Sequence, residues 1–135
     1  MTRIAQIIVA AGKGARLGST IPKQYLKLAG KLLIEHTISA MNSTDLIDET
    51  IIVVAKKDKI ISDIISRYKN IRIVIGGDTR AKSAYLGLKS VKNLNIKNVL
   101  IHDAARPNFS IKLLNTLNEN LKLYNCVIPA IKTPD

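Results

Sequence analysis

The sequence has little cysteine, few aromatic residues and few acidic residues, and each shortage limits what the protein can be. Its single cysteine, Cys126, cannot form an internal disulfide, and no second cysteine or histidine stands near it at a spacing typical of metal ligands. We therefore expect Cys126 to be a buried thiol on a strand rather than a reactive group. No apolar run approaches the roughly 18 consecutive residues of a membrane-spanning helix.

The N-terminal segment MTRIAQIIVAAGKG leads from an apolar run directly into a glycine loop, with no signal-peptide cleavage site between them. Together with the missing membrane span, this start predicts a cytoplasmic protein that has no membrane as a partner. The 47% of hydrophobic residues and 23% of charged residues are typical of one ordinary folded domain with enough apolar mass for a core.

Acidic residues are outnumbered, with 10 Asp and Glu against 21 Lys and Arg and a formal net charge of +11. Such an excess indicates an anionic partner, and nucleic acid is the first class to consider. However, the lysines are spread over nearly every polar segment, and the one Phe and four Tyr do not gather into a platform for stacking bases. We therefore interpret most of the charge as solvated surface and expect no nucleic acid partner, beyond weak and salt-sensitive contacts.

Apolar runs rich in Ile and Val alternate with segments of helical periodicity, which is typical of β-α units that build a parallel sheet. Continuous apolarity in runs such as QIIVAA and TIIVVA indicates strands that are buried on both faces. We therefore expect an α/β fold: one Rossmann-like domain over residues 1–135, with an open, mostly parallel sheet and flanking helices. The predicted strands cover Ile4–Ala10, Thr50–Ala55, Ile71–Ile75, Asn98–Asp103 and Cys126–Ala130.

Four helices are predicted between these strands from apolar residues at helical spacing. We expect Ser110 to cap the last of them. His36, in the middle of the first, has no partner in its sequence surroundings and is expected on the surface. The apolar residues of the four helices run from Leu33 to Met41, from Ile60 to Tyr68, from Ala84 to Val91 and from Ile111 to Leu121.

Glycine-rich and polar segments follow three of the predicted strands, at Gly12–Gly18, Gly76–Arg80 and Asp103–Pro107. The carboxyl ends of parallel strands meet at one edge of an open sheet and form its ligand crevice. We therefore expect these three segments to converge on one site.

The segment AAGKGARLG, residues 10–18, has three glycines that would let backbone N–H groups approach phosphate oxygens. It is not a Walker A loop, which ends in Gly-Lys-Ser/Thr, and not a dinucleotide fingerprint, which needs glycine at the position of Leu17. Lys13, between two of the glycines, is either a phosphate contact or a solvated loop charge, and the sequence leaves both open. Lys23 follows in the run IPKQY, directly after Pro22.

Four motifs in order carry a family resemblance. The loop pattern AAG-x-G-x-R followed by PKQY, the segment GGDTRAKS at residues 76–83 and the segment HDAARP at residues 102–107 resemble the 2-C-methyl-D-erythritol 4-phosphate cytidylyltransferase family. Ribitol-phosphate cytidylyltransferases are the alternative, although AAG and HDAARP favour methylerythritol phosphate. The resemblance implies a nucleotidyltransferase of isoprenoid precursor synthesis that uses CTP and a polyol phosphate and releases pyrophosphate.

The resemblance also implies roles for individual residues. Arg16 and Lys23 would be catalytic cations, because a guanidinium fork and a compact ammonium suit phosphate oxygens that gain charge in the transition state. Mg²⁺, bound mainly through the CTP phosphates and by no dedicated metal-ligand residues, would supply the rest. The implied nucleotide-binding residues are Ala10, Ala11, Gly12, Gly14, Gly77, Asp78, Ser83, Asp103 and Ala104, and the implied acceptor-binding residues are Asp103 and Arg106.

Two residues in these motifs, Asp78 and His102, also have simpler interpretations. Asp78 follows two glycines, and Gly-Gly-Asp is a sequence that favours a turn, so Asp78 is alternatively a turn residue without a ligand. His102 and Asp103 are adjacent on a predicted strand and so point to opposite faces, which argues against a catalytic His–Asp pair. We therefore expect His102 to be structural.

Members of the family are longer than this chain. The stretch Val127–Asp135 resembles the family's strand leading into an acceptor contact, with the threonine of that contact absent. We therefore expect a truncated chain, whose missing C-terminal part includes the arm that pairs two subunits of a homodimer. A fragment that binds CTP without turnover is accordingly a second interpretation.

Overall fold

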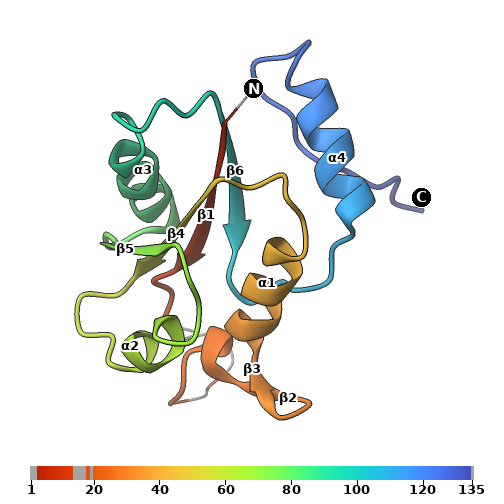
Figure 1. Ribbon diagram of the computed structural model, residues 1–135. Coiled ribbons are helices and arrows are strands. Elements are labelled where there is room, and N and C mark those ends of the chain that lie inside the picture. Colours follow the sequence, from red (N-terminus) through yellow and green to blue (C-terminus); the bar gives the residue numbers. More distant parts are fainter. Residues whose placement is uncertain (1–2, 14–17, 19, 135) are drawn as a thin grey trace.

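A computed structural model gives the fold of residues 3–13, 18 and 20–134 (Figure 1). A four-stranded parallel sheet lies at its centre, in the strand order β5-β4-β1-β6. A separate antiparallel hairpin is formed by β2 (Lys27–Leu28) and β3 (Lys31–Leu32). The strands of the main sheet are β1 (Ile4–Ala10), β4 (Glu49–Val54), β5 (Ile71–Ile75) and β6 (Asn98–Asp103).

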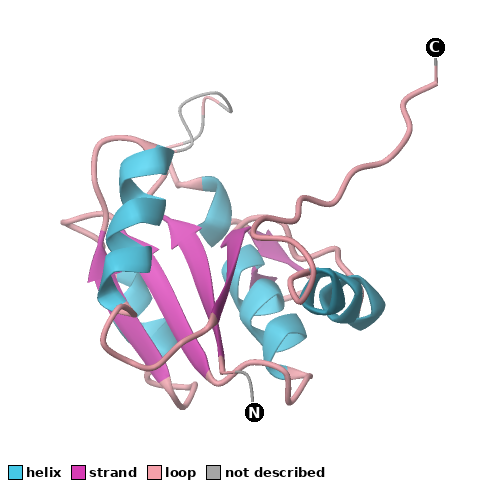
Figure 2. Cartoon of the chain, turned by 90° about the horizontal axis from the view of Figure 1, so that it is seen from above, coloured by secondary structure: helices cyan, strands magenta, loops and turns pink. Residues whose placement is uncertain are grey.

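Helices cover both faces of the main sheet (Figure 2). On one face, α1 and α2 pack on even-numbered residues of β1 and β4, and α4 packs beside α1 against β6. On the other face, α3 packs on the odd-numbered residues of β1 and β4. The helices are α1 (Leu33–Asn42), α2 (Ile60–Ile65), α3 (Arg80–Ser90) and α4 (Ile111–Asn120), and a 3-10 turn, η2, covers Lys23–Tyr25.

Strand β1 is the centre of the core because it pairs with β4 on one side and with β6 on the other. Ile7 stands in register between Ile51 and Ile101, and both Ile7 and Ile8 are fully buried. The two side chains point to opposite faces, so each face of the sheet gains an apolar contact from the same strand. Burying one such isoleucine contributes about 1.5–3 kcal/mol to stability.

The predicted fold class is confirmed, and four of the five predicted strands are present. Three of them have the predicted bounds, and the strand predicted at Thr50–Ala55 is shifted by one residue to Glu49–Val54. The predicted cap of α4 is also present, because Ser110 Oγ accepts a hydrogen bond from Leu113 N at 3.1 Å.

The strand predicted at Cys126–Ala130 is wrong for this structure. Residues 126–130 have no assigned strand, Cys126 is exposed, and Ile128 keeps 79% of its surface accessible. A strand is held by ladder hydrogen bonds to a neighbour, and an apolar run does not specify which neighbour that is. Here the segment runs away from the sheet (Figure 2), so the expected burial of the Cys126 thiol is wrong as well.

His36 also differs from the prediction, since it has a definite partner. Its Nε2 atom lies 2.7 Å from the carbonyl oxygen of Leu28, and the side chain is half-buried. This contact ties α1 to the β2–β3 hairpin, which follows η2 in the chain. The contact was not visible in the sequence because its two residues belong to different elements.

Gly87, in the middle of α3, allows the helix to lie close to the sheet. A Cβ atom at this position would stand 2.6 Å from Ile7 Cγ2 and 2.9 Å from Val53 Cγ2, both on buried strands. Helix propensity alone would make alanine about 1 kcal/mol better here. Because the core has no room to yield, we expect Gly87→Ala instead to lower the free energy of unfolding by about 1–3 kcal/mol in urea denaturation.

Lys89→Ala, at an exposed position of the same helix, is the control for this measurement. It should change the free energy of unfolding by no more than about 0.5 kcal/mol. A Gly87→Ala variant that is more stable than the parent protein would show that α3 does not press on the sheet in the way described.

Candidate active site

A cleft of about 970 Å³ opens at the carboxyl edge of the main sheet. Residues that follow all four parallel strands line it, together with η2. The expected convergence of the three glycine-rich and polar segments is therefore confirmed for their described residues that line the cleft, which in the first segment are Gly12 and Lys13. The lining residues include Ala11, Gly12 and Lys13 after β1, Lys23 and Gln24 on η2, Lys56 and Lys57 after β4, Gly76 to Thr79 after β5, Arg80 and Ser83 on α3, Asp103 at the end of β6, and Ala104 to Arg106 after it.

The segment after β1 enters the cleft as soon as the strand ends. Ala10 is still buried at the end of β1, whereas Ala11 and Gly12 line the cleft. A Cβ atom at Gly12 would meet no atom within 4 Å, so its backbone faces open space. Gly14 and Arg16, which were predicted to bind the triphosphate and to act in catalysis, lie outside the described residues.

Lys23 reaches the cleft from η2, a turn that is held on two sides. Gln24 is buried and donates from Nε2 to the carbonyl oxygens of Ala10, at 2.7 Å, and of Gly12, at 3.2 Å. Tyr25 donates its hydroxyl hydrogen to Oδ2 of Asp58, in the loop after β4. The sequence pattern PKQY drew attention to Lys23 alone, and the anchoring roles of the next two residues were missed.

Tyr25 is held as a hydrogen-bond donor. Burial raises the pKa of its phenol, and the hydrogen bond and negative charge of Asp58 raise it further. The other oxygen of Asp58, Oδ1, accepts from the backbone N–H groups of Ile60 and Ile61 at 3.0 and 3.1 Å. Asp58 thus connects η2 to the start of α2.

The segment after β5 approaches the β1 segment so closely that it needs glycine. A Cβ atom at Gly76 would lie 2.9 Å from Ala11 Cβ and 2.6 Å from Ser83 Oγ. Gly77 N donates to Ser83 Oγ at 3.1 Å, and Ser83 is only 1% exposed. In this structure the Ser83 hydroxyl therefore holds the Gly77 backbone, and its predicted contact with a base stays a prediction. Asp78 is exposed on the wall of the cleft.

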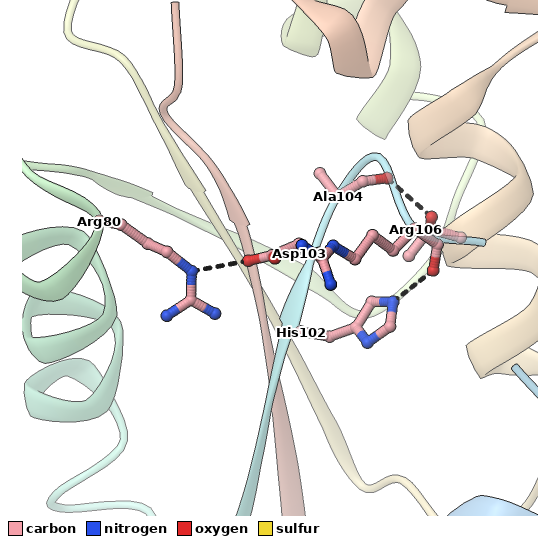
Figure 3. A network of polar contacts seen from close by, with 6 residues as sticks. Arg80, His102, Asp103, Ala104 and Arg106 are labelled. Carbon is pink, nitrogen blue, oxygen red and sulfur yellow. Dashed lines mark hydrogen bonds and ion pairs between the residues drawn. The ribbon is translucent and has the colours of Figure 1, made fainter. Parts of the chain in front are cut away.

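Asp103 stands between two arginines at the opposite wall (Figure 3). Its Oδ1 atom accepts from Arg80 Nε at 2.8 Å, and its Oδ2 atom lies 3.2 Å from Arg106 Nε. Arg80 is the first residue of α3, so this network joins the segment after β5 to the segment after β6. Both arginine side chains are largely exposed to solvent.

The neighbours of Asp103 in the chain, His102 and Ala104, hold the segment after β6 in place. Ala104 is buried; its N–H donates to the carbonyl oxygen of Val9 at 3.0 Å, and its own carbonyl accepts from Thr37 Oγ1 at 2.7 Å. His102 Nε2 lies 2.6 Å from the carbonyl oxygen of Arg106, and its ring packs edge-on against Phe109. His102 points away from Asp103 (Figure 3), so the predicted structural role of His102 is confirmed.

The cleft is strongly cationic. Among the residues that the structure describes, six basic side chains line it and two acidic ones, Asp78 and Asp103, and both oxygens of Asp103 are already paired with arginines. Clefts with one sign of charge concentrate ions of the opposite sign, so this site suits a ligand with several negative charges. The basic residues are Lys13, Lys23, Lys56, Lys57, Arg80 and Arg106.

Three of these cations, Lys56, Lys57 and Arg80, were given no role from the sequence, and Lys13 was left open between a phosphate contact and a solvated charge. A signal for them exists in the sequence, since Lys56 and Lys57 follow the end of a predicted strand just as the glycine segments do. Arg80 was quoted within GGDTRAKS without a role. Its partner Asp103 lies 23 residues away in the chain, so the pair could not be inferred from local spacing.

Comparison with known proteins decides the family. A family model described as IspD, 2-C-methyl-D-erythritol 4-phosphate cytidylyltransferase, matches residues 4–135. The chain belongs to the IspD family. It is 51% identical over 131 residues to the bifunctional enzyme IspD/IspF of Pelagibacter ubique. The matched region covers 96% of this chain and 34% of that protein.

Solved structures of IspD proteins share the fold. The 4-diphosphocytidyl-2C-methyl-D-erythritol synthase of Anaerococcus prevotii superposes with a TM-score of 0.77 at 35% identity, over 90% of this chain and 51% of that one. The bifunctional IspDF of Campylobacter jejuni gives a TM-score of 0.78 at 29% identity, over 99% and 34%. This chain therefore spans about a third of the bifunctional relatives and about half of a shorter one.

The position of Asp103 in this IspD chain leads to a prediction about anion binding. Asp103→Asn removes the negative charge between Arg80 and Arg106, so both guanidinium groups become free for an anion. One charge at about 4 Å in water is worth about 1 kcal/mol, so tripolyphosphate should bind roughly five-fold more tightly. Isothermal titration calorimetry at low salt measures the dissociation constant.

Asp63→Asn, at an exposed position of α2 outside the cleft, is the matched control and should leave tripolyphosphate affinity unchanged. Weaker binding by the Asp103→Asn variant would mean that the carboxylate organises the two arginines for the anion instead of competing with it.

Proposed function

We propose that this chain forms the nucleotide-binding part of an enzyme that transfers CMP from CTP to 2-C-methyl-D-erythritol 4-phosphate and releases pyrophosphate. The observation that carries the proposal is that the motifs shared with the IspD family, although far apart in the sequence, line one cationic cleft. The names of the relatives support the choice of CTP and methylerythritol phosphate as substrates.

The proposed reaction needs charge to be neutralised and reactants to be positioned. An oxygen of the acceptor phosphate attacks the α-phosphorus of CTP, and the bond from that phosphorus to the bridging oxygen breaks. Pyrophosphate leaves with the electron pair of that bond. Negative charge grows on the oxygens around the α-phosphorus, so fixed cations at this point lower the barrier.

The residues of the cleft divide this work between its two walls. Lys23 is the described cation that we assign to the α-phosphate, and Arg16 is assigned to the same group on the basis of the loop motif. Arg106 carries a planar fork of donors that suits the acceptor phosphate. Asp103 can accept hydrogen bonds from sugar hydroxyls once an anion competes for its arginines.

The base would lie near the segment after β5. Gly77 and Asp78 offer backbone and carboxylate groups at the wall of the cleft, and Ser83 keeps the Gly77 backbone in place. An exocyclic amine and a ring acceptor, as cytosine has, pair well with a carbonyl oxygen and an N–H group. We propose that Gly77 and Asp78 read the base and that Ala11 and Gly12 approach the triphosphate, while Ala10, buried at the end of β1 and outside the lining of the cleft, supports them.

Mg²⁺ is part of the proposal as an ion carried by the CTP phosphates. The described residues contain no group of three or more His, Cys, Asp or Glu side chains that could hold a metal, and both Asp103 oxygens are paired with arginine. This donor set fits an ion held by phosphate oxygens and water rather than by a protein cage. When bound, the ion would neutralise charge on the phosphates.

We further propose that the full-length protein is a cytoplasmic homodimer, without a specific nucleic acid or membrane partner. Among the helices that the structure describes, none is long and apolar enough to cross a membrane. The proposed dimer rests on the family resemblance alone.

The acceptor is tested by pyrophosphate release from the full-length protein, with CTP and either methylerythritol 4-phosphate or ribitol 5-phosphate. The account predicts turnover with methylerythritol 4-phosphate and little with ribitol 5-phosphate. The reverse preference would move the protein to the ribitol-phosphate enzymes. CTP binding without any turnover would support the second interpretation, a binding module.

Lys23→Ala in the full-length protein should lower kcat much more than it weakens CTP binding. The ammonium group is assigned to charge that develops in the transition state, and removing one such donor costs about 2–4 kcal/mol. Lys112→Ala, on the exposed surface of α4, should change neither quantity. A raised KM with unchanged kcat would mean that Lys23 only holds the ground-state phosphates.

A further inference from the structure

Gln24 is a buried residue whose side-chain amide contacts the segment Ala10–Gly12, at the end of β1. Its side chain is 6% exposed, and its Nε2 group donates to two carbonyl oxygens, of Ala10 at 2.7 Å and of Gly12 at 3.2 Å. An amide NH₂ has two hydrogens, so one side chain can satisfy both acceptors. These two carbonyls belong to the point where β1 ends and the chain enters the cleft.

The direction of these carbonyls matters for an anionic ligand. A backbone carbonyl oxygen carries partial negative charge and would repel phosphate oxygens if it faced the cleft. Because Gln24 Nε2 pairs with the Ala10 and Gly12 oxygens, neither oxygen is left without a donor at the cleft, so the N–H groups of this segment are the ones expected to meet an anion. Preorganised donors of this kind are more effective than donors that must first rotate into place.

Gln24 also fixes Lys23, because the two residues are consecutive in η2. The turn is closed by Tyr25 N donating to the Pro22 carbonyl at 2.9 Å and by Leu26 N donating to the Lys23 carbonyl at 3.1 Å. Its far side is held by the Tyr25 hydroxyl on Asp58. The backbone of Lys23 is thus fixed between the end of β1 and the loop after β4.

We propose that Gln24 is a positioning residue: its amide sets the orientation of the Ala10–Gly12 backbone and the place of Lys23 as one unit, so that both meet the same triphosphate. Gln24 lines the cleft, but its amide hydrogens are taken by the two backbone oxygens, so the account assigns it no contact with substrate. The proposal rests on the proposed function for the identity of the ligand, but the contacts from which it is argued exist in the free protein.

The first experiment compares the two buried glutamines of the chain, Gln24 and Gln6. Gln6 is fully buried on β1 and donates from Nε2 to Thr50 Oγ1, outside the cleft. Met replaces either side chain at similar volume without a donor. The Gln24→Met and Gln6→Met variants of the full-length protein are measured for CTP dissociation constant and for amide hydrogen exchange of residues 10–13 without ligand.

Gln24→Met should weaken CTP binding roughly ten-fold, as expected for unpaired acceptors in a preorganised site. It should also speed hydrogen exchange of residues 10–13 in the free protein. Gln6→Met should change neither, whatever it does to the melting temperature. The KM for the acceptor should stay unchanged in both variants.

A second variant, Gln24→Glu, keeps the shape and changes the hydrogen-bonding character with pH. As a carboxylate it can only accept, and it faces two carbonyl oxygens. Burial and those oxygens raise the pKa of the introduced carboxyl, so lowering the pH restores a proton that can be donated to one carbonyl. Between pH 8 and pH 6, CTP affinity of Gln24→Glu should recover relative to Gln24→Met.

The comparison with Gln24→Met isolates the introduced carboxyl. All other ionisable groups that line the cleft are common to the two variants, and so is the titration of CTP itself. Among the described residues these groups are Lys13, Lys23, Lys56, Lys57, Asp78, Arg80, Asp103 and Arg106.

The outcomes separate the two proposals. If the parent protein binds CTP and Gln24→Met binds it equally well with unchanged hydrogen exchange, the positioning role is wrong and the proposed function stands. If the parent protein does not bind CTP, the proposed function fails, and faster exchange in Gln24→Met alone would still support the anchoring of the segment. Equal pH dependence of Gln24→Glu and Gln24→Met would contradict the role of the amide hydrogens.

Discussion

The pairing of β1 with β4 on one side and β6 on the other is the constraint on which the site depends. Parallel pairing brings the carboxyl ends of these strands to one edge, and the register places Ala10 beside Val54 and Val9 beside Asp103. Burial of apolar side chains such as those of Ile7 and Ile8, which are fully buried, stabilises this arrangement. The segments that follow the strands therefore line one cleft.

Within that cleft, a few buried polar contacts hold exposed charges in place. Gln24 and Tyr25 are buried, while Lys23 beside them reaches the cleft; Ser83 is buried and keeps Gly77 in position. Asp103 is the exception, since its carboxylate pairs with two largely exposed arginines. Such exposed pairs contribute little to stability, so they are free to rearrange when an anion arrives.

The sequence was a good guide where local pattern decides the structure and a poor one where distant partners do. Continuous Ile and Val runs predict β1, β4, β5 and β6, and the motifs predict which segments line the cleft. The hydrogen bonds from Gln24 to Ala10 and from Arg80 to Asp103 join residues that are 14 and 23 positions apart in the sequence, so a local pattern does not predict them. The strand predicted at Cys126–Ala130 fails for the same reason, because apolarity gives no information about a pairing partner.

The central claim is that three separate segments form one nucleotide site, and a CTP titration followed by amide hydrogen exchange tests it most directly. The account predicts that residues 11–13, 76–83 and 103–106 gain protection together, at one CTP concentration, while α4 is unaffected. ATP and GTP at the same concentrations should protect residues 76–83 less. Protection of only one segment, or protection confined to the hollow of about 470 Å³ between α3 and β6, would contradict the account.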